Sequence, residues 1–384
     1  MDFTVETLLT LPGVMVFKCS SLIGNELCLH LEFPNKTINC PHCNQETDDV
    51  NQIRLVLIRD LPACGRIIYL EVPRRQFYCA ICNKYFVETL AFLENRRKHT
   101  RRFEEYIYHR ACYSSFEQVG REEDITTEEV ESIFKHIHED GTKKKWQKAK
   151  RISIDEFSMC KGEGNLKTVV SDIDQRTLLE VIDSHKQEKV IEVLMEQPLE
   201  VREAIEEVSV DMLGGFPKVV KKVFPNASLV IDRFHVMQKV INFLSEVCRQ
   251  CEIKTRKERY VILKNGKNLS TEERNKLNEL LKKKRLRQAY EYKEDFLWFY
   301  ENSESIEEGR EKLKDWMRKA SPIYGSVIDT IHKHFEGICN YFRSRASSGV
   351  MEGINTRIKL LKRQAYGFRL FTNMRHRLLA AFSN

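Results

Sequence analysis

The spacing of apolar residues changes at two places along this chain of 384 residues. Up to about residue 95, short apolar runs such as GVMVFKC and ELCLHLEF alternate with polar residues, which is the period of half-buried β-strands. From about residue 100 to 140 the apolar positions follow helical spacing, and strand-like runs return after Arg151. We therefore expect a β domain, a helical segment and a mixed α/β region, in that order.

The helical segment predicts two short helices joined by a polar turn at 122–125. The first begins at Ser115, and Thr126 or Thr127 would cap the second. The second helix carries an apolar stripe at Val130, Ile133, Phe134 and Ile137. This order is typical of a helix-turn-helix that binds DNA. However, any small helical bundle shows such a stripe, and the second helix is rich in Glu rather than Arg or Asn.

The region after Arg151 predicts a five-stranded sheet with a regular order of elements. We expect a strand at 152–154, a two-stranded hairpin at 166–185, a helix at 187–196, a strand at 208–210, a helix at 216–223 and a last strand at 229–232. Asp155, Asp211 and Asp232 end the first, fourth and fifth strands. This is the order of an RNase H-like core, in which the first and fourth strands lie side by side.

The rest of the chain is mainly helical. One helix near the C-terminus would turn Val350, Ile354, Ile358 and Leu361 towards the sheet. Its adjoining face would carry Glu352, Asn355, Lys359 and Arg363. A carboxylate beside an amide and two cations suits a site for metal and phosphate.

Composition narrows the class of protein. With 42% hydrophobic residues the chain can bury a sizeable core, so a disordered or fibrous protein is excluded. No stretch approaches the roughly 20 apolar residues that span a bilayer, and the start MDFTVETLLTLPG does not read as a signal peptide. We expect a cytoplasmic protein with no membrane partner.

Positive charge is concentrated in two segments, although the net charge is only +7. Residues 254–287 hold 13 Lys or Arg against 4 Asp or Glu, and residues 343–377 hold 9 against Glu352 alone. Such density favours a polyanion such as DNA over a solvated helix face. Candidate DNA contacts are Lys143, Lys144, Lys145, Lys282, Lys283, Lys284, Arg285, Arg357 and Lys362.

Cysteine spacing predicts a structural zinc site. Cys40 and Cys43 stand in CPHC, and Cys79 and Cys82 stand in CAIC. Two such CxxC turns make a tetrahedral four-thiolate site, and the intervening IRLVLIRDLPACGRIIYLEVPRRQFYC reads as a hairpin that returns the second pair to the first. Buried thiols without metal are the alternative. His42 and Cys64 do not fit the paired pattern, and Cys248 with Cys251 in helical sequence indicates packing.

Asp155, Asp211 and Glu352 are the candidate catalytic residues. Carboxylates are the ligands that hard cations prefer, and two ions can assist an in-line phosphoryl displacement. We therefore expect Mg²⁺ or Mn²⁺ at two positions held by these three residues, without a covalent protein intermediate.

Asp232 is the rival of Asp211 for the second position. With His235 it forms DRFH, and both residues are interpreted as supporting groups, together with Asn355, Lys359 and Arg363. Glu156 would point to the opposite face of its strand from Asp155.

Several segments together resemble the ISL3 family of bacterial transposases, members of the DDE superfamily. They are CPHC with RRQFYCAICNKYF, ISIDEFS, VSVDMLGGFPKVVKKVFPNASLVIDRFHVMQKV and EGINTRIKLLKRQAYGFRLFTNMRHRLL, which cover most of the chain in order. The resemblance implies an RNase H-like catalytic domain, DNA cleavage at the ends of an insertion sequence and transfer to target DNA. It also implies that Asp155, Asp211 and Glu352 form the catalytic triad.

A long helical insertion between the fifth strand and Glu352 is likewise implied by the resemblance. We hypothesise that it grips the transposon end, and that Trp298 or Trp316 stacks on a flipped base, although a core role is the commoner one for tryptophan.

The expected fold class is therefore multidomain, α+β and α/β. We expect a zinc-binding β domain at 1–95, a helix-turn-helix-like region with linker at 96–150, the first part of the RNase H-like core at 151–240, the α-helical insertion at 241–340 and the C-terminal core helices at 341–384.

The expected partners are double-stranded DNA at element ends and target, and a second copy of the chain in a homodimer or larger synaptic complex in the nucleoid. Two other functions remain open: a domesticated DNA-binding regulator, and a metal-dependent RNase H-like nuclease acting on other substrates.

Overall fold

The computed structural model describes residues 9–11, 13–22, 24–138, 146–159, 166–212, 215–345, 349–365 and 370–382. The chain divides into two compact units. The first comprises Met1–Gly141 with Gln364–Tyr366, and the second comprises Thr142–Arg363 with Gly367–Asn384.

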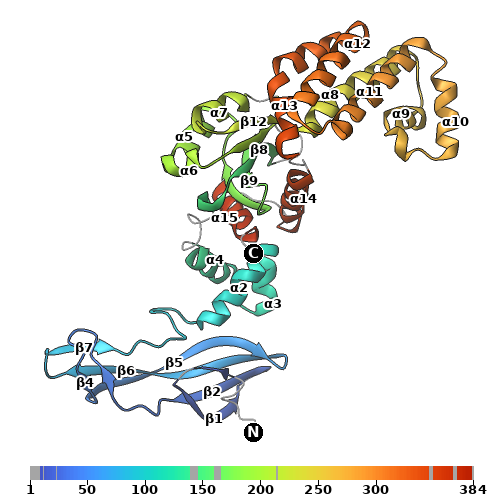
Figure 1. The fold of residues 1–384 in the computed structure, drawn as a ribbon. Helices are drawn as coiled ribbons and strands as arrows, with labels where there is room; N and C mark the ends of the chain where they lie inside the picture. The colour runs from blue at the N-terminus through green and yellow to red at the C-terminus, as the bar shows by residue number, and fades with distance from the viewer. Residues whose placement is uncertain are drawn as a thin grey trace. The chain divides into compact units, whose positions relative to one another are not determined.

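A five-stranded sheet forms the larger part of the first unit (Figure 1). Its strands are β1 (Met15–Ser21), β2 (Glu26–Glu32), β5 (Val50–Ala63), β6 (Arg66–Cys79) and β7 (Lys84–Val87). The order is β1-β2-β6-β5, with β7 also paired to β6, and β2 runs parallel to β6 while the other pairs are antiparallel. Leu29, Ile58, Leu70 and Val72 form the centre of the hydrophobic core on one face.

The long β5–β6 hairpin occupies the gap between the two cysteine pairs, as the sequence predicted. Cys64 and Gly65 form its turn with φ angles of 52° and 73°, which glycine adopts readily and other residues rarely. Beside the far end of the hairpin, the short strands β3 (Ile38–Asn39) and β4 (Glu46–Thr47) flank the first CxxC turn.

Four cysteines therefore meet at this end of the sheet. The Sγ atoms of Cys40 and Cys82 lie 3.6 Å apart, as do those of Cys43 and Cys79, and all four sulfurs lie within 4.8 Å of one another. A tetrahedral zinc ion with Zn–S bonds of about 2.3 Å requires sulfurs roughly 3.8 Å apart, so the cluster fits zinc. Hydrogen bonding by the backbone N–H of Cys82 lowers the pKa of the Cys79 thiol to about 7, whereas burial raises the pKa of Cys82 to about 12, so Cys79 is the thiol of this pair that ionises first. Neither His42 nor Cys64 belongs to the cluster.

In the described part of the first unit, three helices follow the sheet: α2 (Arg101–Tyr113), α3 (Phe116–Glu123) and α4 (Thr127–His138). The predicted starts are confirmed, because Ser115 caps α3 and the Thr126 hydroxyl accepts from Glu129 N at 3.1 Å at the start of α4. Helix α3 continues to Glu123, so the turn is shorter than expected.

The turn between α3 and α4 depends on Gly120. A Cβ atom there would lie 2.7 Å from the carbonyl oxygen of Ile125, so only glycine allows this close approach.

The second unit contains a five-stranded sheet with the order β10-β9-β8-β11-β12. Its strands are β8 (Arg151–Ser158), β9 (Leu166–Asp172), β10 (Thr177–Ile182), β11 (Glu207–Val210) and β12 (Ser228–Ile231). β8, β11 and β12 are parallel, so the predicted adjacency of the first and fourth strands is confirmed. The prediction that the first strand ends at Asp155 is wrong: pairing with β11 stops at Ile154, but pairing with β9 carries β8 on to Ser158.

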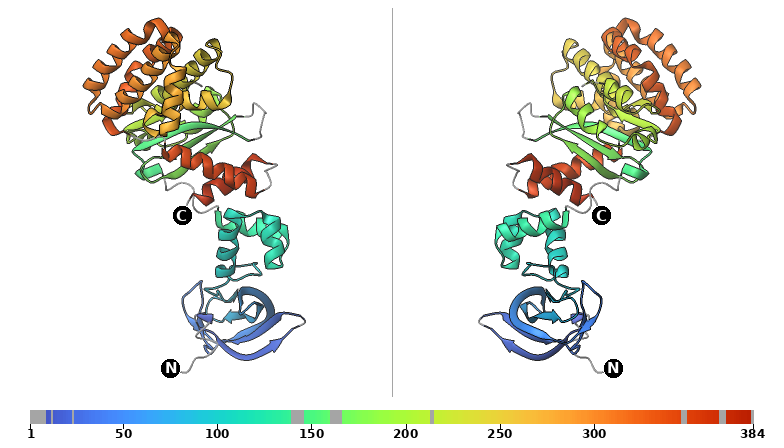
Figure 2. Two further views of the ribbon diagram at one scale, coloured as in Figure 1. Left: turned by 90° about the vertical axis from the view of Figure 1, so that its right-hand side faces the viewer. Right: turned by 90° about the vertical axis from the view of Figure 1, so that its left-hand side faces the viewer.

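Helices cover this sheet and extend from it. They are α5 (Gln187–Met195), α6 (Leu199–Glu203), α7 (Phe216–Val223), α8 (Arg233–Gln250), α9 (Arg256–Leu263), α10 (Thr271–Leu280), α11 (Lys284–Asn302), α12 (Ile306–Lys333), α13 (Phe335–Ser344), α14 (Gly349–Gln364) and α15 (Phe371–Ala381). Short 3₁₀ turns lie at Trp146–Lys148 and Gly266–Asn268. Figure 2 shows α14 and α15 on one side of the sheet and the remaining helices on the other.

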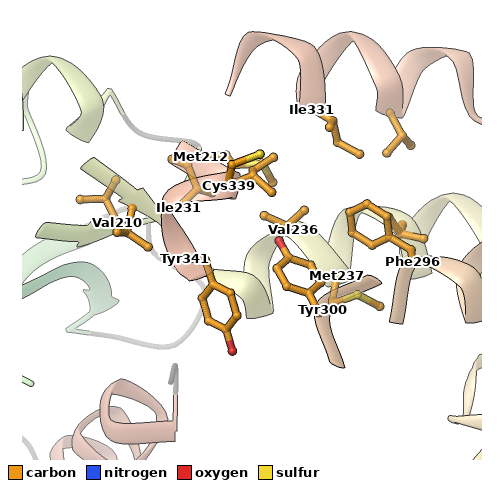
Figure 3. Close-up of a cluster of buried hydrophobic side chains, with 14 of the residues drawn as sticks. Val210, Met212, Ile231, Val236, Met237, Phe296, Tyr300, Ile331, Cys339 and Tyr341 are labelled. Carbon is orange, nitrogen blue, oxygen red and sulfur yellow. The ribbon is translucent and has the colours of Figure 1, made fainter. Parts of the chain in front are cut away.

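One hydrophobic core runs from the sheet into the helices at 233–344. It joins Val210 and Ile231 of the strands to Val236 of α8, Phe296 of α11 and Cys339 of α13 (Figure 3). α13 lies directly on β12, since a Cβ at Gly337 would approach Ile231 Cγ1 to 2.8 Å. Because the apolar cluster is continuous, these helices are held to the sheet by shared burial rather than by a core of their own.

In the part of the chain that the structure describes, no helix has the length and apolar character needed to cross a membrane.

Replacing Cys43 by serine removes one of the four thiolates. We expect bound zinc to fall from about one ion per chain to near zero, measured by atomic absorption on the full-length protein. We also expect the melting temperature to fall by about 10 °C. This corresponds to a loss of about 2 kcal/mol, since 1 kcal/mol shifts the melting temperature of a small domain by about 4–8 °C.

Cys64→Ser is the matched control, because Cys64 is exposed in the hairpin turn and lies outside the cluster. Retention of zinc and of the melting temperature by the Cys43 variant would contradict the assignment.

Candidate active site

Three aspartates lie at one edge of the second sheet. Ile154 pairs with Val210, and Val210 with Ile231, so Asp155, Asp211 and Asp232 follow three neighbouring residues of parallel strands. Parallel strands end at the same edge, which brings together side chains far apart in sequence. Asp232 N also donates to Val210 O at 2.9 Å, which fixes the start of α8 against β11.

His235 links two of these aspartates. It lies on the first turn of α8, where Asp232 caps the helix by accepting from Phe234 N at 2.9 Å. The Nδ1 atom of His235 lies 3.3 Å from Asp211 Oδ2, and its Nε2 atom lies 3.9 Å from Asp232 Oδ2. The imidazole therefore lies between Asp211 and Asp232 and is nearer to Asp211.

Helix α14 brings the distant Glu352 to the same edge. Asn355 Nδ2 donates to Asp155 Oδ2 at 2.7 Å, while Asp155 Oδ1 accepts from Glu156 N at 2.8 Å. The apolar residues Ile354, Ile358 and Leu361 are buried, as predicted for the face towards the sheet. Glu352 lies one turn before Asn355 and is exposed.

A cleft of about 320 Å³ lies between these elements. Its walls are Asp155, Glu156, Asp232, Phe234, His235, Met351, Glu352, Asn355, Thr356 and Lys359. The cleft thus joins two of the three predicted catalytic residues with four of the predicted supporting residues. Asp211 is not part of the wall and reaches it through His235.

Burial, with a smaller contribution from neighbouring carboxylates, perturbs two acidic groups in this cleft. Burial raises the pKa of Asp232, and the carboxylates of Asp155 and Asp211 raise it further, against the effects of Phe234 N–H and His235. Burial also raises the pKa of Glu156, with added repulsion from Asp155 and Asp211. A bound cation would offset the cost of burying these carboxylates.

The carboxylates are the type of ligand that divalent cations prefer, but their oxygen atoms do not form a close cluster in this structure. Among the described residues, the four cysteines are the one group of three or more His, Cys, Asp or Glu ligands within 4.8 Å. Asn355 Oδ1 and Glu156 Oε1 are buried without a hydrogen-bond partner. Hard oxygen donors without partners fit Mg²⁺ or Mn²⁺, and binding would require the side chains around the cleft to close in.

The candidate DNA contacts fall into different environments. Lys282, Lys283, Lys284 and Arg285 are exposed at the start of α11, and Arg363 is exposed on α14. Arg357 donates to Ala381 O at 2.5 Å and Lys362 donates to Ser158 O at 2.5 Å, so both hold elements of the second unit together. Lys143, Lys144 and Lys145 lie outside the described residues.

The two tryptophans proposed for base stacking differ. Trp316 is buried against Phe296 and Tyr324, and its Nε1 donates to Tyr292 O at 2.8 Å, so it is a core residue and the stacking hypothesis is wrong for it. Trp298 is 53% exposed, with Lys312 Nζ 4.5 Å from its ring centroid.

Sequence reasoning missed Glu156 and Phe234 as parts of the cleft. Glu156 was expected on the opposite face of the strand from Asp155, yet it lines the same cleft. Its place beside Asp155 was visible, but the burial that raises its pKa depends on elements distant in sequence.

Three family models match successive parts of the chain. Residues 36–82 match the zinc-finger of transposase IS204/IS1001/IS1096/IS1165, and residues 88–138 match the helix-turn-helix domain of transposase family ISL3. Residues 152–378 match the ISL3 family model described as a transposase. The matches cover the cysteine cluster, the helices α2–α4 and the whole cleft.

Two curated proteins are similar in sequence. The transposase for insertion sequence element IS1001 of Bordetella parapertussis is 25% identical over 365 residues, which are 90% of this chain and 89% of that protein. A protein named ATP-dependent protease from Lactococcus lactis subsp. lactis is 31% identical over 99 residues, or 26% of this chain and 31% of that protein. The short match carries no argument about the cleft.

Asp232→Asn should raise the melting temperature of the metal-free protein at pH 7.5. Asparagine keeps the cap on α8 but removes a buried charge that Asp155 and Asp211 repel. A raised pKa in the folded state means that the ionised form costs stability above that pKa, so the gain should shrink as the pH falls towards the ordinary aspartate range.

Differential scanning fluorimetry across this pH range measures the effect, with Glu200→Gln on the exposed surface of α6 as control. A lower melting temperature for Asp232→Asn at pH 7.5 would contradict the prediction, because it would show that the ionised Asp232 carboxylate stabilises the fold.

Proposed function

This chain belongs to the ISL3 family of transposases, and we propose that it cuts DNA at the ends of an insertion sequence and joins the freed 3′-hydroxyl to target DNA. One observation carries the proposal: Asp155 and Glu352, from opposite ends of the second unit, line one cleft, where Asn355 orients Asp155. An acidic cleft of this kind is suited to divalent-cation-assisted phosphoryl transfer.

Asp155, Asp211 and Glu352 are the proposed catalytic triad. In favour of Asp211 is its position at the end of β11, beside β8. Asp232 is a stronger candidate for the second position of the triad than the sequence alone indicated, because it lines the cleft while Asp211 contacts it through His235. We assign His235 the role of positioning Asp211, and Asn355 the role of positioning Asp155.

In the proposed reaction, a water molecule attacks the phosphorus at the element end, and the bond from phosphorus to the 3′-oxygen breaks. The freed 3′-hydroxyl then attacks a target phosphodiester, so one ester bond is exchanged for another and no external energy source is needed. Magnesium or manganese ions held by the carboxylates would supply Lewis-acid stabilisation of the developing charge. Lys359, exposed on the cleft wall, is placed to contact a phosphate oxygen.

The remaining parts are assigned from the fold. The strand order β10-β9-β8-β11-β12 supports an RNase H-like core, and the helices between β12 and α14 support a helical insertion within it. The helix-turn-helix domain implies DNA binding, and we propose that with the zinc domain it recognises the element ends. Synapsis of two ends requires a second copy of the chain.

The decisive test is end cleavage with Mg²⁺ on duplex DNA carrying the termini that flank the gene. We expect Asp155→Asn, Asp211→Asn and Glu352→Gln each to lower cleavage by at least about a thousandfold, while end binding stays within about threefold of wild type. Glu200→Gln should cut normally.

Comparison of Asp211→Asn with Asp232→Asn identifies the second ligand, because only loss of a ligand should abolish cleavage at saturating Mg²⁺. Normal cutting by any triad variant would remove that residue from the assignment. End binding without cleavage by the wild-type protein would favour a DNA-binding regulator, and cleavage without preference for the termini would favour a nuclease.

A further inference from the structure

A second and larger concavity lies on the other side of β12 from the α14 cleft. It has a volume of about 770 Å³ and is bounded by α7, β12, both halves of α12 and the N-terminal part of α13. Leu229, Ile231, Met317 and Phe335 contribute apolar surface to its lining. We call this concavity the β12 groove.

The β12 groove is rich in basic groups. Lys221 of α7, Lys314 and Lys333 of α12, and the imidazoles of His332 and His334 line it. All three lysines are exposed, and none forms an ion pair with an acidic residue in the described part of the chain. The one carboxylate in the lining, Glu336, is paired with Arg310, so the groove carries uncompensated positive charge.

The groove begins next to the acidic edge of the sheet. Ile231 lines the groove, and the next residue, Asp232, lines the cleft. His334, on the groove wall, lies close enough to Asp211 for that carboxylate to affect its pKa, which burial and Lys333 lower overall. A DNA strand that extends from the acidic edge past the end of β12 would therefore reach the basic groove.

We propose that the β12 groove binds an unpaired stretch of DNA strand next to the phosphodiester that is cut. This rests on the proposed function, and it names a strand-binding site for that reaction. Lys221, Lys314 and Lys333 bind the phosphates, and the apolar lining contacts the bases.

The chemistry of the lining favours a single strand over a duplex. A duplex presents phosphates outward and keeps its bases stacked inside, so it would leave apolar groove surface uncovered. An unpaired strand exposes bases and phosphates together, and sites for such strands combine a basic channel with aromatic surface. Phe335 provides that surface, with Lys314 Nζ 5.9 Å from its ring centroid.

The test is binding of fluorescent oligothymidylate of about 12 nucleotides to the full-length protein, measured by anisotropy without divalent cation. For the variant Lys221→Glu/Lys314→Glu/Lys333→Glu we expect affinity to fall at least about tenfold. The slope of log affinity against log salt should flatten by roughly 2, since each single-strand phosphate contact contributes about 0.7. Binding of blunt duplex carrying the element ends should change much less.

Lys186→Glu/Lys189→Glu/Lys222→Glu is the matched control, with the same change of charge on α7 and near α5 but outside the groove lining. A milder variant with glutamine at Lys221, Lys314 and Lys333 should lose affinity in the same direction, and its melting temperature checks the fold.

Equal oligothymidylate affinity in the groove and control variants would overturn the proposal, as would an equal loss for duplex and single strand. Binding of thymidine monophosphate is measured in the same way. If the groove variant loses only this binding and keeps that of oligothymidylate, the groove binds a small nucleotide and the proposal is overturned. Binding is measured without cleavage, so failure of the wild type to cut element ends would reject the proposed function and leave this result standing.

Discussion

The partial burial of carboxylates at one sheet edge is the constraint on which the site of the second unit depends. Parallel pairing of β8, β11 and β12 places Asp155, Asp211 and Asp232 at neighbouring strand ends. Burial prevents water from screening them fully, so the pKa of Asp232 rises. The fold thus holds these carboxylates at one sheet edge, although three of them do not come within 4.8 Å of one another in the described structure.

Polar contacts from helices keep this arrangement ordered. Asn355 holds Asp155 from α14, His235 lies between Asp211 and Asp232, and Phe234 N–H holds Asp232 at the start of α8. Each support comes from a helix, and helices restrict side chains more than loops do. Hydrophobic packing elsewhere offsets the free energy lost by burying these carboxylates, chiefly in the continuous core that joins the sheet to α8, α11 and α13.

The same core determines where charge can gather. α13 lies on β12 so closely that Gly337 has no room for a side chain, and Asn340 Nδ2 donates to Leu229 O at 2.9 Å. This contact covers the edge strand and leaves the β12 groove beside it. Acidic and basic surfaces consequently lie next to the same strand, and the proposed reaction would use the first for a cation and the second for the DNA strand.

Much of this protein could be predicted from local sequence. Helix starts at Ser115 and Thr126, the strand runs around Asp155 and Asp211, and the paired cysteines all depend on residue spacing, which acts over a few residues. The length of β8 could not be predicted, because its last residues are held by β9 rather than by their own pattern. Local spacing also could not decide whether Trp298 or Trp316 is exposed, since both stand in amphipathic helices.

The sequence by itself determined the types of residue available and their order: four thiols in two pairs, acidic residues after apolar runs, and basic segments in the second half. Only the tertiary structure decided which of them meet. Asp232 lines the cleft, whereas Asp211 contacts it through His235. Arg357 and Lys362 donate to backbone carbonyls. Three lysines outside the dense basic segments line the β12 groove. Burial and pairing depend on the strands and helices packed around a residue, and no single segment of sequence contains that information.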